Sequence, residues 1–456
     1  MNDVRAIPSA PGALPLVGHL VRLLRDPLAF LTSLPAHGDL VRIRLGPLTV
    51  VVVCDAELTR QVLVGDRVFD KGGPVYNRAR EVAGNGLPTC PHSAHRRQRR
   101  MIQPAFHPAR LRGYADTMTG RIDERTAAWR AGQVLQVSTE MMAIASQAAA
   151  AAFFSRTLPS AELGRIVDDV TTVINGMGRR MLMVPPLDRI PTPRNRSYLR
   201  ARARLRDTLD RIVARRLAEG TDRGDLLSAL IAARDPEKGG PGLSGAEISD
   251  QTIAFFLAGT ETTAATVSWA LDLLARHPDL ERRVHAEVDA VLGGAAATHA
   301  DLPGLTLTER VVTETLRLRP PGWFVTRSVS ADTELGGHPL PAGTTVAYSA
   351  YLIHHRPDLY DRPGTFDPDR WDPGRPQPPR HALIPFAAGA RKCIGDTFAT
   401  TEAVLALATV TARWRLVHLP GAGRRPAVAM TLRPRDLRMR AQPRTAPRTP
   451  GASSAE

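Results

Sequence analysis

Hydrophobic and polar positions follow two patterns along the chain, and these patterns divide it into regions. Over residues 38–55 (GDLVRIRLGPLTVVVVCD), β-branched residues lie on both sides of a Gly-Pro break, which predicts a hairpin at the edge of a small sheet. From about residue 56 to residue 320 the pattern is typical of helices, and short strands are expected again over 325–349. Stretches rich in glycine and proline interrupt the helical region at 72–88, 181–195 and 235–244. The pattern therefore predicts a mainly α protein with a minor β region.

The same pattern shows no internal repeat and no long linker. We therefore expect a single domain over residues 1–440, which begins with a proline-rich leader at 1–20 and is followed by a disordered tail over 441–456. The leader lacks both an apolar run of about 20 residues and the apolar core of a signal peptide. We expect no membrane anchor and a cytoplasmic protein.

Charge narrows the possible partners only a little. The chain of 456 residues has 60 Lys or Arg against 45 Asp or Glu, a formal charge of +15, and lysine occurs only at positions 71, 238 and 392. Usage rich in arginine, alanine and proline is typical of a GC-rich genome, which weakens any inference from charge to nucleic acid. No RNA-binding aromatic strand or zinc-finger spacing is present, so we expect no nucleic-acid partner. An acidic protein partner fits the charge.

Three scattered cysteines argue against a disulfide framework and for a reducing compartment. Cys54 follows a run of valines and is expected to be a buried strand residue, whereas Cys90, beside prolines, is expected in a loop. Cys393 has no second cysteine and no zinc-type spacing within reach. A lone thiol in such a setting is either a nucleophile or a soft metal ligand, and the residues alone show no base beside it.

Cys393 belongs to the stretch FAAGARKCIG (386–395), whose spacing is more specific than the thiol alone. The stretch fits the pattern F-x-x-G-x-R-x-C-x-G through Phe386, Gly389, Arg391, Cys393 and Gly395. In this stretch the chain resembles the cytochrome P450 family. The resemblance implies a haem b whose iron is bound by the Cys393 thiolate.

The resemblance gives the other fixed positions a role. Gly389 and Gly395 are expected to allow positive φ and a close approach of the backbone to the flat macrocycle. Phe386 is expected to shield the sulfur from water, and Arg391 to pair with a haem propionate. Backbone N–H groups and the N-terminus of a helix that begins near Ile394 would favour the thiolate.

A polar run, AGTETT (258–263), interrupts the apolar helix expected over 250–274. Buried hydroxyls compete for the helix backbone and leave donors to satisfy, so a gain must offset their cost. The run resembles the family's oxygen-binding helix. By that resemblance Ala258 and the glycine after it open a kink beside the haem, and Glu261 and Thr262 form the acid-alcohol pair that relays protons. Without the other motifs, an ordinary helix with internal hydroxyls and a packing glycine would be the better explanation of the run.

Two further constellations gain meaning only from the resemblance. Glu314 and Arg317 lie three residues apart in ETLR and can form an ion pair. In the family such a pair meets an arginine of a downstream loop, here Arg370 in FDPDRW, and forms a structural lock rather than a catalytic site. His95 and Arg99 lie four residues apart and are expected to face one propionate-bearing edge of the haem.

Arg327, in PPGWFVTR, fits a further propionate partner, whereas His95 taken alone would be an ordinary surface histidine. The resemblance extends from the leader to about residue 435 and implies the cytochrome P450 fold, a triangular helical prism with small β-sheets. It also implies a monooxygenase that inserts oxygen from O2 into an unactivated C–H bond. Electrons are expected from NAD(P)H through a ferredoxin reductase and a separate ferredoxin or flavodoxin. The ferredoxin or flavodoxin is expected to dock near Cys393, and the protein is expected to be a monomer.

The positions that resemble the family's substrate-contacting segments are apolar in this chain. They are Phe255, Phe256, Ala258, Trp323, Phe324 and Val325. The segment 175–187, where a mobile lid is expected, is rich in methionine and has no carboxylate. These positions predict a compact, uncharged substrate. Local sequence similarity to actinomycete sesquiterpene oxidases favours a cyclic terpene of secondary metabolism. The alternatives are a polyketide, a steroid or a fatty acid as substrate, or a haem-binding sensor without turnover.

Overall fold

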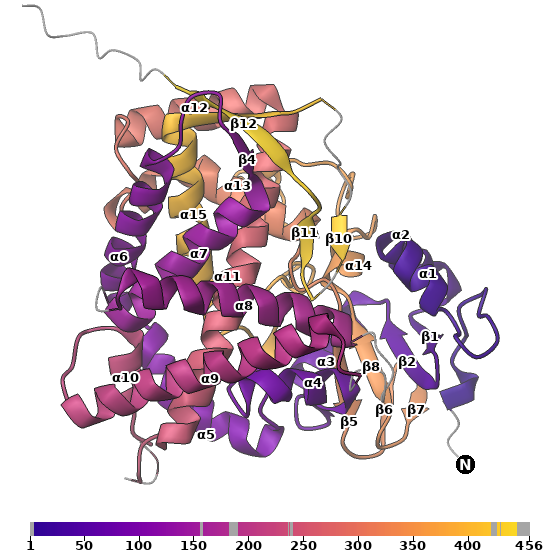
Figure 1. Cartoon of the computed structure of the whole chain (residues 1–456). Helices are drawn as coiled ribbons and strands as arrows, with labels where there is room; N and C mark the ends of the chain where they lie inside the picture. Colours follow the sequence, from indigo (N-terminus) through magenta and orange to yellow (C-terminus); the bar gives the residue numbers. More distant parts are fainter. Residues whose placement is uncertain are drawn as a thin grey trace, which may run out of the picture.

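A computed structural model describes residues 4–155, 158–181, 190–235, 237, 240–420, 426–428 and 430–444. Helices make up most of it, and Figure 1 shows a broad helical part beside a smaller part that contains the main sheet. The prediction of a mainly α protein with a minor β region is therefore confirmed. Among the described residues, no helix is long and apolar enough to cross a membrane.

The α-helices are α1 (Leu20–Arg25), α2 (Pro27–Ser33), α3 (Ala56–Val64), α4 (Gly73–Ala83), α5 (His92–Ile102), α6 (Pro108–Ala127), α7 (Val137–Phe154), α8 (Ser160–Met181), α9 (Pro193–Glu219), α10 (Leu226–Ala232), α11 (Gly245–Arg276), α12 (Pro278–Leu292), α13 (Thr306–Leu318), α14 (Ala350–His354) and α15 (Asp396–Arg413). The strands are β1 (Leu40–Leu45), β2 (Leu48–Val53), β3 (Phe69–Asp70), β4 (Val134–Gln136), β5 (Val325–Val329), β6 (Thr333–Leu335), β7 (His338–Leu340), β8 (Thr345–Tyr348), β9 (Trp414–His418), β10 (Pro426–Val428), β11 (Leu432–Pro434) and β12 (Arg438–Pro443).

Helix α11 runs through the middle of the helical part and packs against α7, α9, α13 and α15. Ser244 begins it with a capping box, in which the Ser244 side chain accepts from the Glu247 N–H and the Glu247 carboxylate accepts from the Ser244 N–H. Neighbours on several sides explain why most of the 250–274 segment is apolar and buried. The expected long apolar helix is confirmed, and it extends a turn or more beyond the expected N-terminal limit.

The main sheet has the strand order β1-β2-β8-β5-β3. Strands β1 and β2 pair antiparallel with Leu45 opposite Leu48, so the hairpin predicted over 38–55 is confirmed. Strand β8 lies parallel to β2 and antiparallel to β5, which brings the short strands of 325–349 against the hairpin. Smaller sheets join β4-β12-β9, β10-β11 and β6-β7.

The buried apolar residues form two clusters. One fills the helical part, and the other lies between the main sheet and the N-terminal helices, where Cys54 is fully buried, as predicted, directly after β2. Two boundaries differ from expectation. The stretch 72–88 is not only a break, because α4 occupies most of it, and β12 runs to Pro443, past the expected start of the tail at 441.

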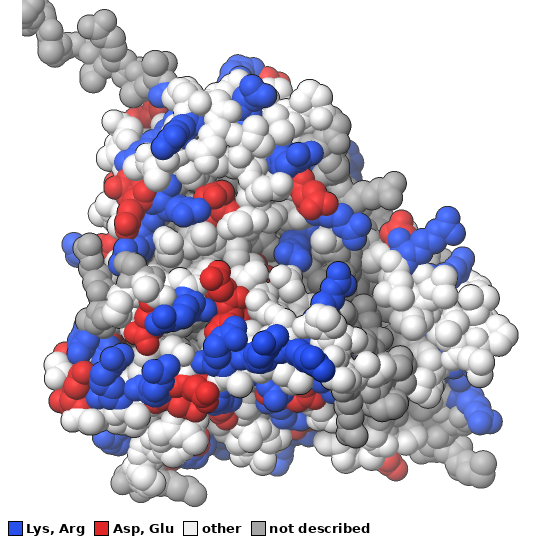
Figure 2. All heavy atoms as spheres, in the orientation of Figure 1, with Lys and Arg blue, Asp and Glu red and all other residues white. Residues whose placement is uncertain are grey.

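Surface charge is mixed on the face shown in Figure 2, where basic side chains form a row over α9. The exposed arginines of this helix are Arg194, Arg196, Arg200, Arg204, Arg211 and Arg215. Carboxylates lie among them, and the Arg204 guanidinium pairs with Asp169 of α8. On this face the charge is thus mixed rather than of one sign.

Candidate active site

A cavity of about 480 Å³ lies between α11, α4, α5 and the segment that precedes α15. Most of its lining is apolar, and Cys393 opens onto it. Glu261 and Thr262 of α11 line the same space. One cavity therefore brings together the lone thiol and the polar run, which are more than 130 residues apart in the sequence.

The backbone around Cys393 is held by local hydrogen bonds. The Cys393 N–H donates to the Phe386 carbonyl at 2.9 Å, and the Lys392 N–H donates to the Gly389 carbonyl at 3.1 Å. Helix α15 begins two residues later than expected, at Asp396, with Gly395 as its N-cap. Burial raises the pKa of the Cys393 thiol, and the Gly395 N–H acts in the opposite direction. Phe386 lines the cavity beside the thiol.

The two glycines of this stretch differ from each other. Gly389 has a φ of +68°, and a Cβ at this position would lie 2.4 Å from the Leu63 carbonyl oxygen, so the residue must be small where α3 ends. The positive φ expected at Gly389 is confirmed, and the close approach that the structure shows is to α3. Gly395 lines the cavity but has a φ of −99°, so the expected positive φ is wrong at this position.

Arg391 lines the cavity but is already paired within the protein. Its Nη2 lies 2.7 Å from Asp70, its Nε lies 3.4 Å from Asp66, and its Nη1 donates to the Cys90 carbonyl at 2.9 Å. Cys90 is buried outside the helices. Pairing of Arg391 with a haem propionate stays a prediction, and in the structure two carboxylates of the chain itself hold the guanidinium.

The other expected propionate partners lie at the same end of the cavity. His95 is buried, and burial together with Arg391 lowers its pKa to about 3, so its ring is neutral at pH 7. Arg327 is buried and donates to the Tyr76 hydroxyl at 3.0 Å. Arg99 lies at the rim, where its Nη1 donates to a backbone carbonyl, that of Lys392.

Sequence reasoning missed Lys71 and Tyr76, which line this end of the cavity with Arg327. Lys71 follows β3 and Tyr76 lies on α4, inside the stretch that was expected to be a break. The sequence could have pointed to Lys71, since lysine occurs at only three positions in the chain. No pattern in the sequence marks Tyr76.

The hydroxyls of α11 explain how its polar run is tolerated. The Thr262 Oγ1 donates to the Ala258 carbonyl at 2.6 Å, and Thr260 and Thr266 donate in the same way to the carbonyls four residues before them. Ala258 is exposed to the cavity. Glu261 is buried, and burial raises its pKa. The Thr431 hydroxyl and the positive charge of Arg433, beside and on β11, lower the same pKa.

The expected substrate positions divide into two groups. Phe255, Ala258 and Val325 line the cavity. The remaining three do not, which corrects the expectation: Phe256 packs on the rings of α7, and Trp323 and Phe324 pack on each other in the second core cluster.

Further apolar lining comes from residues that the sequence did not single out, among them Phe106, Phe153, Ile174, Met177, Leu316 and Met430. The expected lid at 175–187 falls in two parts: residues 175–181 form the C-terminal end of α8, and residues 182–187 lie outside the described residues.

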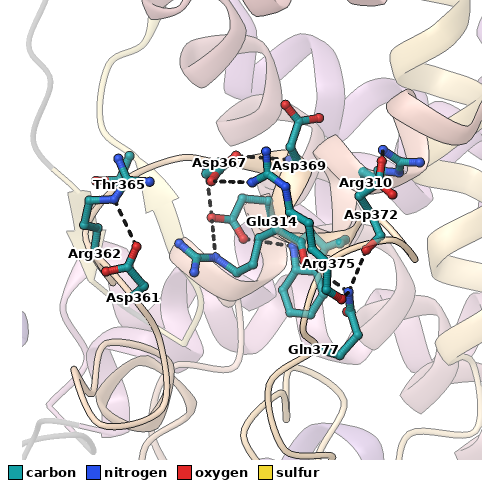
Figure 3. Close-up of polar contacts among 12 residues, drawn as sticks. Arg310, Glu314, Asp361, Arg362, Thr365, Asp367, Asp369, Asp372, Arg375 and Gln377 are labelled. Atoms are coloured by element: carbon teal, nitrogen blue, oxygen red, sulfur yellow. Dashed lines mark hydrogen bonds and ion pairs between the residues drawn. The ribbon is translucent and has the colours of Figure 1, made fainter.

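Glu314, Arg317 and Arg370 meet away from the cavity. The Arg317 Nε and Nη2 donate to the two carboxylate oxygens of Glu314 at 2.9 and 2.8 Å, and Arg370 approaches the same carboxylate at 3.6 Å. Trp371 donates its indole N–H to Glu314 at 2.9 Å. Figure 3 shows Glu314 in the middle of the polar side chains of the downstream loop. This arrangement is that of a structural lock.

Comparisons with known proteins agree with this geometry. The sequence profile described as Cytochrome P450 matches residues 8–436. Pentalenene oxygenase of Streptomyces avermitilis is 46% identical over 439 residues, which cover 96% of this chain and 97% of that protein. Cyclooctatin synthase and cyclooctat-9-en-7-ol 5-monooxygenase, both of Streptomyces melanosporofaciens, are each 46% identical, over 95% and 91% of this chain and 95% and 90% of their own lengths. The chain therefore belongs to the cytochrome P450 family, as the spacing around Cys393 indicated.

Proposed function

We infer that the protein is a haem-thiolate monooxygenase that inserts one oxygen atom of O2 into an unactivated C–H bond of a cyclic terpene. The observation that carries this inference is the single cavity that Cys393 and the Glu261-Thr262 pair line together. In the described part of the chain, no group of three or more His, Cys, Asp or Glu side chains could hold a metal ion. A lone thiol therefore fits a metal whose other ligands come from a macrocycle, as the family implies.

The residues around the cavity would each serve the haem or the reaction. The haem, when bound, supplies the activation of dioxygen, which a thiolate ligand promotes. Cys393 would bind the iron, Phe386 would limit access of water to the sulfur, and the Gly395 N–H would stabilise negative charge on it. Burial raises the pKa of Glu261, so its carboxyl holds a proton more readily than an exposed one, and Thr262 presents its hydroxyl at the cavity wall.

An apolar substrate is supported by the lining away from the cationic end. Phe255, Ala258 and Val325 meet aromatic and aliphatic side chains of α7, α8 and α13 there, and no charged group of the described chain lies among them except Glu261. Such a surface favours a hydrocarbon and offers few hydrogen bonds for its orientation. The relatives whose names refer to pentalenene and to cyclooctat-9-en-7-ol support a cyclic terpene, with a sesquiterpene such as pentalenene as the first candidate.

Electrons would come from NAD(P)H through a separate ferredoxin or flavodoxin and its reductase. The surface near Cys393 supports an acidic partner, since Lys392 is half exposed there and Arg99 lies beside it. Asp396 pairs with Lys392, so a partner would compete with that carboxylate.

The test begins with the carbon monoxide difference spectrum of the reduced holoenzyme. We expect the red-shifted Soret band of a thiolate ligand, its loss in Cys393→Ser, and its retention in Cys54→Ala, which removes a buried thiol in the other core cluster. Incubation with pentalenene, redox partners and NAD(P)H is expected to give an oxygenated product by gas chromatography and mass spectrometry. Absence of the band in the unmodified protein would reject the proposal, and the band without turnover of any terpene would reject the substrate class.

A further inference from the structure

Exposed large apolar side chains gather at one place on the surface, far along the chain from the residues of the active site. In the described part of the chain ten such side chains are exposed, and half of them lie within residues 14–24. They form an apolar patch that consists of Leu14, Leu16, Val17, Val21 and Leu24. Figure 2 shows an uncharged surface over α1 and the loop before it, with basic side chains at its border. Single exposed apolar residues are ordinary, whereas a contiguous patch indicates a binding surface.

The turn that carries Leu16 is firmly attached to the main sheet. The Leu14 N–H donates to the Gly18 carbonyl and the Gly18 N–H donates to the Leu14 carbonyl, each at 2.9 Å. Gly18 has a φ of +63°, and a Cβ there would lie 2.2 Å from the Arg44 carbonyl oxygen, so only glycine allows the turn to approach β1 this closely. The buried His19 side chain accepts from the Arg44 N–H at 2.9 Å. The apolar patch therefore belongs to a fixed part of the fold.

Leu16 has a backbone conformation that its own side chain disfavours. Its φ is +61°, in the left-handed region that is uncommon for residues other than glycine and unfavourable for bulky ones. The side chain is 89% exposed, so packing within the chain offsets little of this cost. Backbone strain of this kind is typical of functional positions. The turn thus presents a leucine outward, where burial against another surface would stabilise it.

Arginines border the apolar patch. Arg22 and Arg25 of α1 and Arg44 of β1 are exposed, and Arg22 and Arg44 donate to backbone carbonyls of the loop before α1. Among the described residues, no carboxylate pairs with any of these three guanidinium groups. The adjacent Asp26 caps α2 instead, where it accepts from a backbone N–H. Repulsion between these arginines opposes a symmetric contact between two copies of the patch, whereas an anionic surface would be attracted.

We propose that the apolar patch inserts into one leaflet of a bilayer that contains anionic lipids, with Arg22, Arg25 and Arg44 at the level of the headgroups. An exposed leucine turn without an aromatic side chain fits an acyl layer better than a protein partner, because protein interfaces are enriched in aromatic anchors. Arginines beside an apolar surface add attraction to anionic lipids. Such a contact is reversible and requires no helix that crosses the bilayer. A hydrocarbon substrate dissolves in the same layer, but the contact itself does not rest on the proposed function.

The test measures binding of the full-length holoenzyme to sucrose-loaded vesicles by sedimentation. We expect binding to vesicles of phosphatidylglycerol and phosphatidylcholine in equal parts, and binding weaker by about tenfold or more to phosphatidylcholine alone. Leu16→Gly should lower the partition coefficient on the mixed vesicles by about fivefold or more, because it removes the tip of the apolar patch. The positive φ at this position favours glycine, so the variant should fold and unfold thermally at least as well as the unmodified protein.

Charge is tested separately from apolar contact. Replacement of both Arg22 and Arg25 by glutamine should lower the partition coefficient on the mixed vesicles by about tenfold or more. The matched controls lie on α9, which also carries exposed arginines and an exposed leucine. Leu217→Ala, and the joint replacement of Arg211 and Arg215 by glutamine, should leave the partition coefficient nearly unchanged.

Three results would overturn the proposal. The first is no binding of the unmodified protein to the mixed vesicles, or binding that Leu16→Gly leaves unchanged. The second is loss of binding in the α9 variants alone, which would assign the contact to α9. The third is a concentration-dependent dimer in analytical ultracentrifugation that Leu16→Gly dissociates, which would assign the patch to a contact between two copies. Absence of the thiolate band would instead reject the proposed function and leave the bilayer contact standing.

Discussion

Glu314 and Glu402 are both buried carboxyl groups on helices, and their surroundings differ completely. Glu314 of α13 accepts hydrogen bonds from Arg317, Trp371 and the Asp367 N–H. Neither carboxyl oxygen of Glu402 on α15 has a hydrogen-bond partner in the part of the chain that the structure describes. Burial raises the pKa of Glu402 well above its ordinary value. The same residue type is thus a charged centre in one region and a buried acid in the other.

The contrast between the hydrogen-bonded Glu314 and the unpartnered Glu402 reflects two different roles in the fold. The Glu314 network joins α13 to the loop that leads toward Cys393, through the Arg317 donations to the carbonyls of His354 and Pro363. Glu402 lies where α15 packs on α11, and the nearby Thr263 hydroxyl of α11, which does not meet the geometry of a hydrogen bond to it, offsets only part of the effect of burial on its pKa. The first region fixes the path of the chain, and the second places an acid in the wall behind the cavity.

Loss of the Glu314 charge should give the largest effect on stability. Glu314→Gln leaves the fully buried Arg317 without a carboxylate, which typically costs about 3–5 kcal/mol. We expect the free energy of unfolding of the holoenzyme, measured by urea titration with circular dichroism, to fall by this amount. Glu309→Gln, on an exposed position of the same helix, should leave it nearly unchanged. A fall of less than about 1 kcal/mol in Glu314→Gln would show that the network is not a lock.

The sequence predicted one of these two glutamates because its partner is local. Glu314 and Arg317 lie on one helix face, and Arg370 follows in a motif that can be read from the chain. Glu402 stands in an apolar stretch of α15, and only the packing of α11 against it shows that the carboxyl is unsatisfied. Contacts between distant segments carry no signal in one sequence.

The same reason accounts for the other successes and errors. The spacing around Cys393 is set by a local turn and was readable, whereas Lys71 acquires meaning only through Arg327, 256 positions later. The side of α11 that faces the cavity could not be read from residues 250–274, because apolar side chains surround the helix, so Phe256 was assigned to the wrong face. Helix α4 was missed because Pro74 follows two glycines, although proline is compatible with the first turn of a helix.

A smaller and pH-dependent effect is expected at Glu402. Its pKa is raised in the folded state, so the unfolded chain loses this proton first as the pH rises above about 4.3, and the folded state is then penalised. Glu402→Gln removes that penalty. We expect the variant to be more stable than the unmodified protein at pH 8 by about 1–3 kcal/mol, with an advantage that shrinks toward pH 5.

Urea titrations of both proteins at pH 5, 6, 7 and 8 test this sign. Glu309→Gln serves again as the control, because an exposed carboxyl should give no such change between these pH values. A difference that stays constant with pH, or a variant that is less stable at pH 8, would contradict the assignment of Glu402 as a buried acid.

Glu261 is buried like Glu402 and has polar neighbours like Glu314. Of the three glutamates, its replacement should change the free energy of unfolding least. Burial raises its pKa, but Thr431 and Arg433 act in the opposite direction and the side chain borders the cavity. We expect Glu261→Gln to change the free energy of unfolding by less than about 1 kcal/mol. The ratio of product formed to NAD(P)H consumed should fall several-fold in the reconstituted system, because an amide cannot deliver the proton that a carboxylic acid can.

Two threonines on the same helix sharpen this last prediction. Thr262→Ala should lower the product ratio as Glu261→Gln does, with peroxide released instead. Thr260→Ala should not, since Thr260 makes the same backbone hydrogen bond but is fully buried. If all three variants lowered the ratio equally, disturbance of the helix would explain the loss. If Glu261→Gln alone kept the ratio, proton delivery would have to pass through the cavity without it, and Glu261 would then resemble Glu402 in being merely buried.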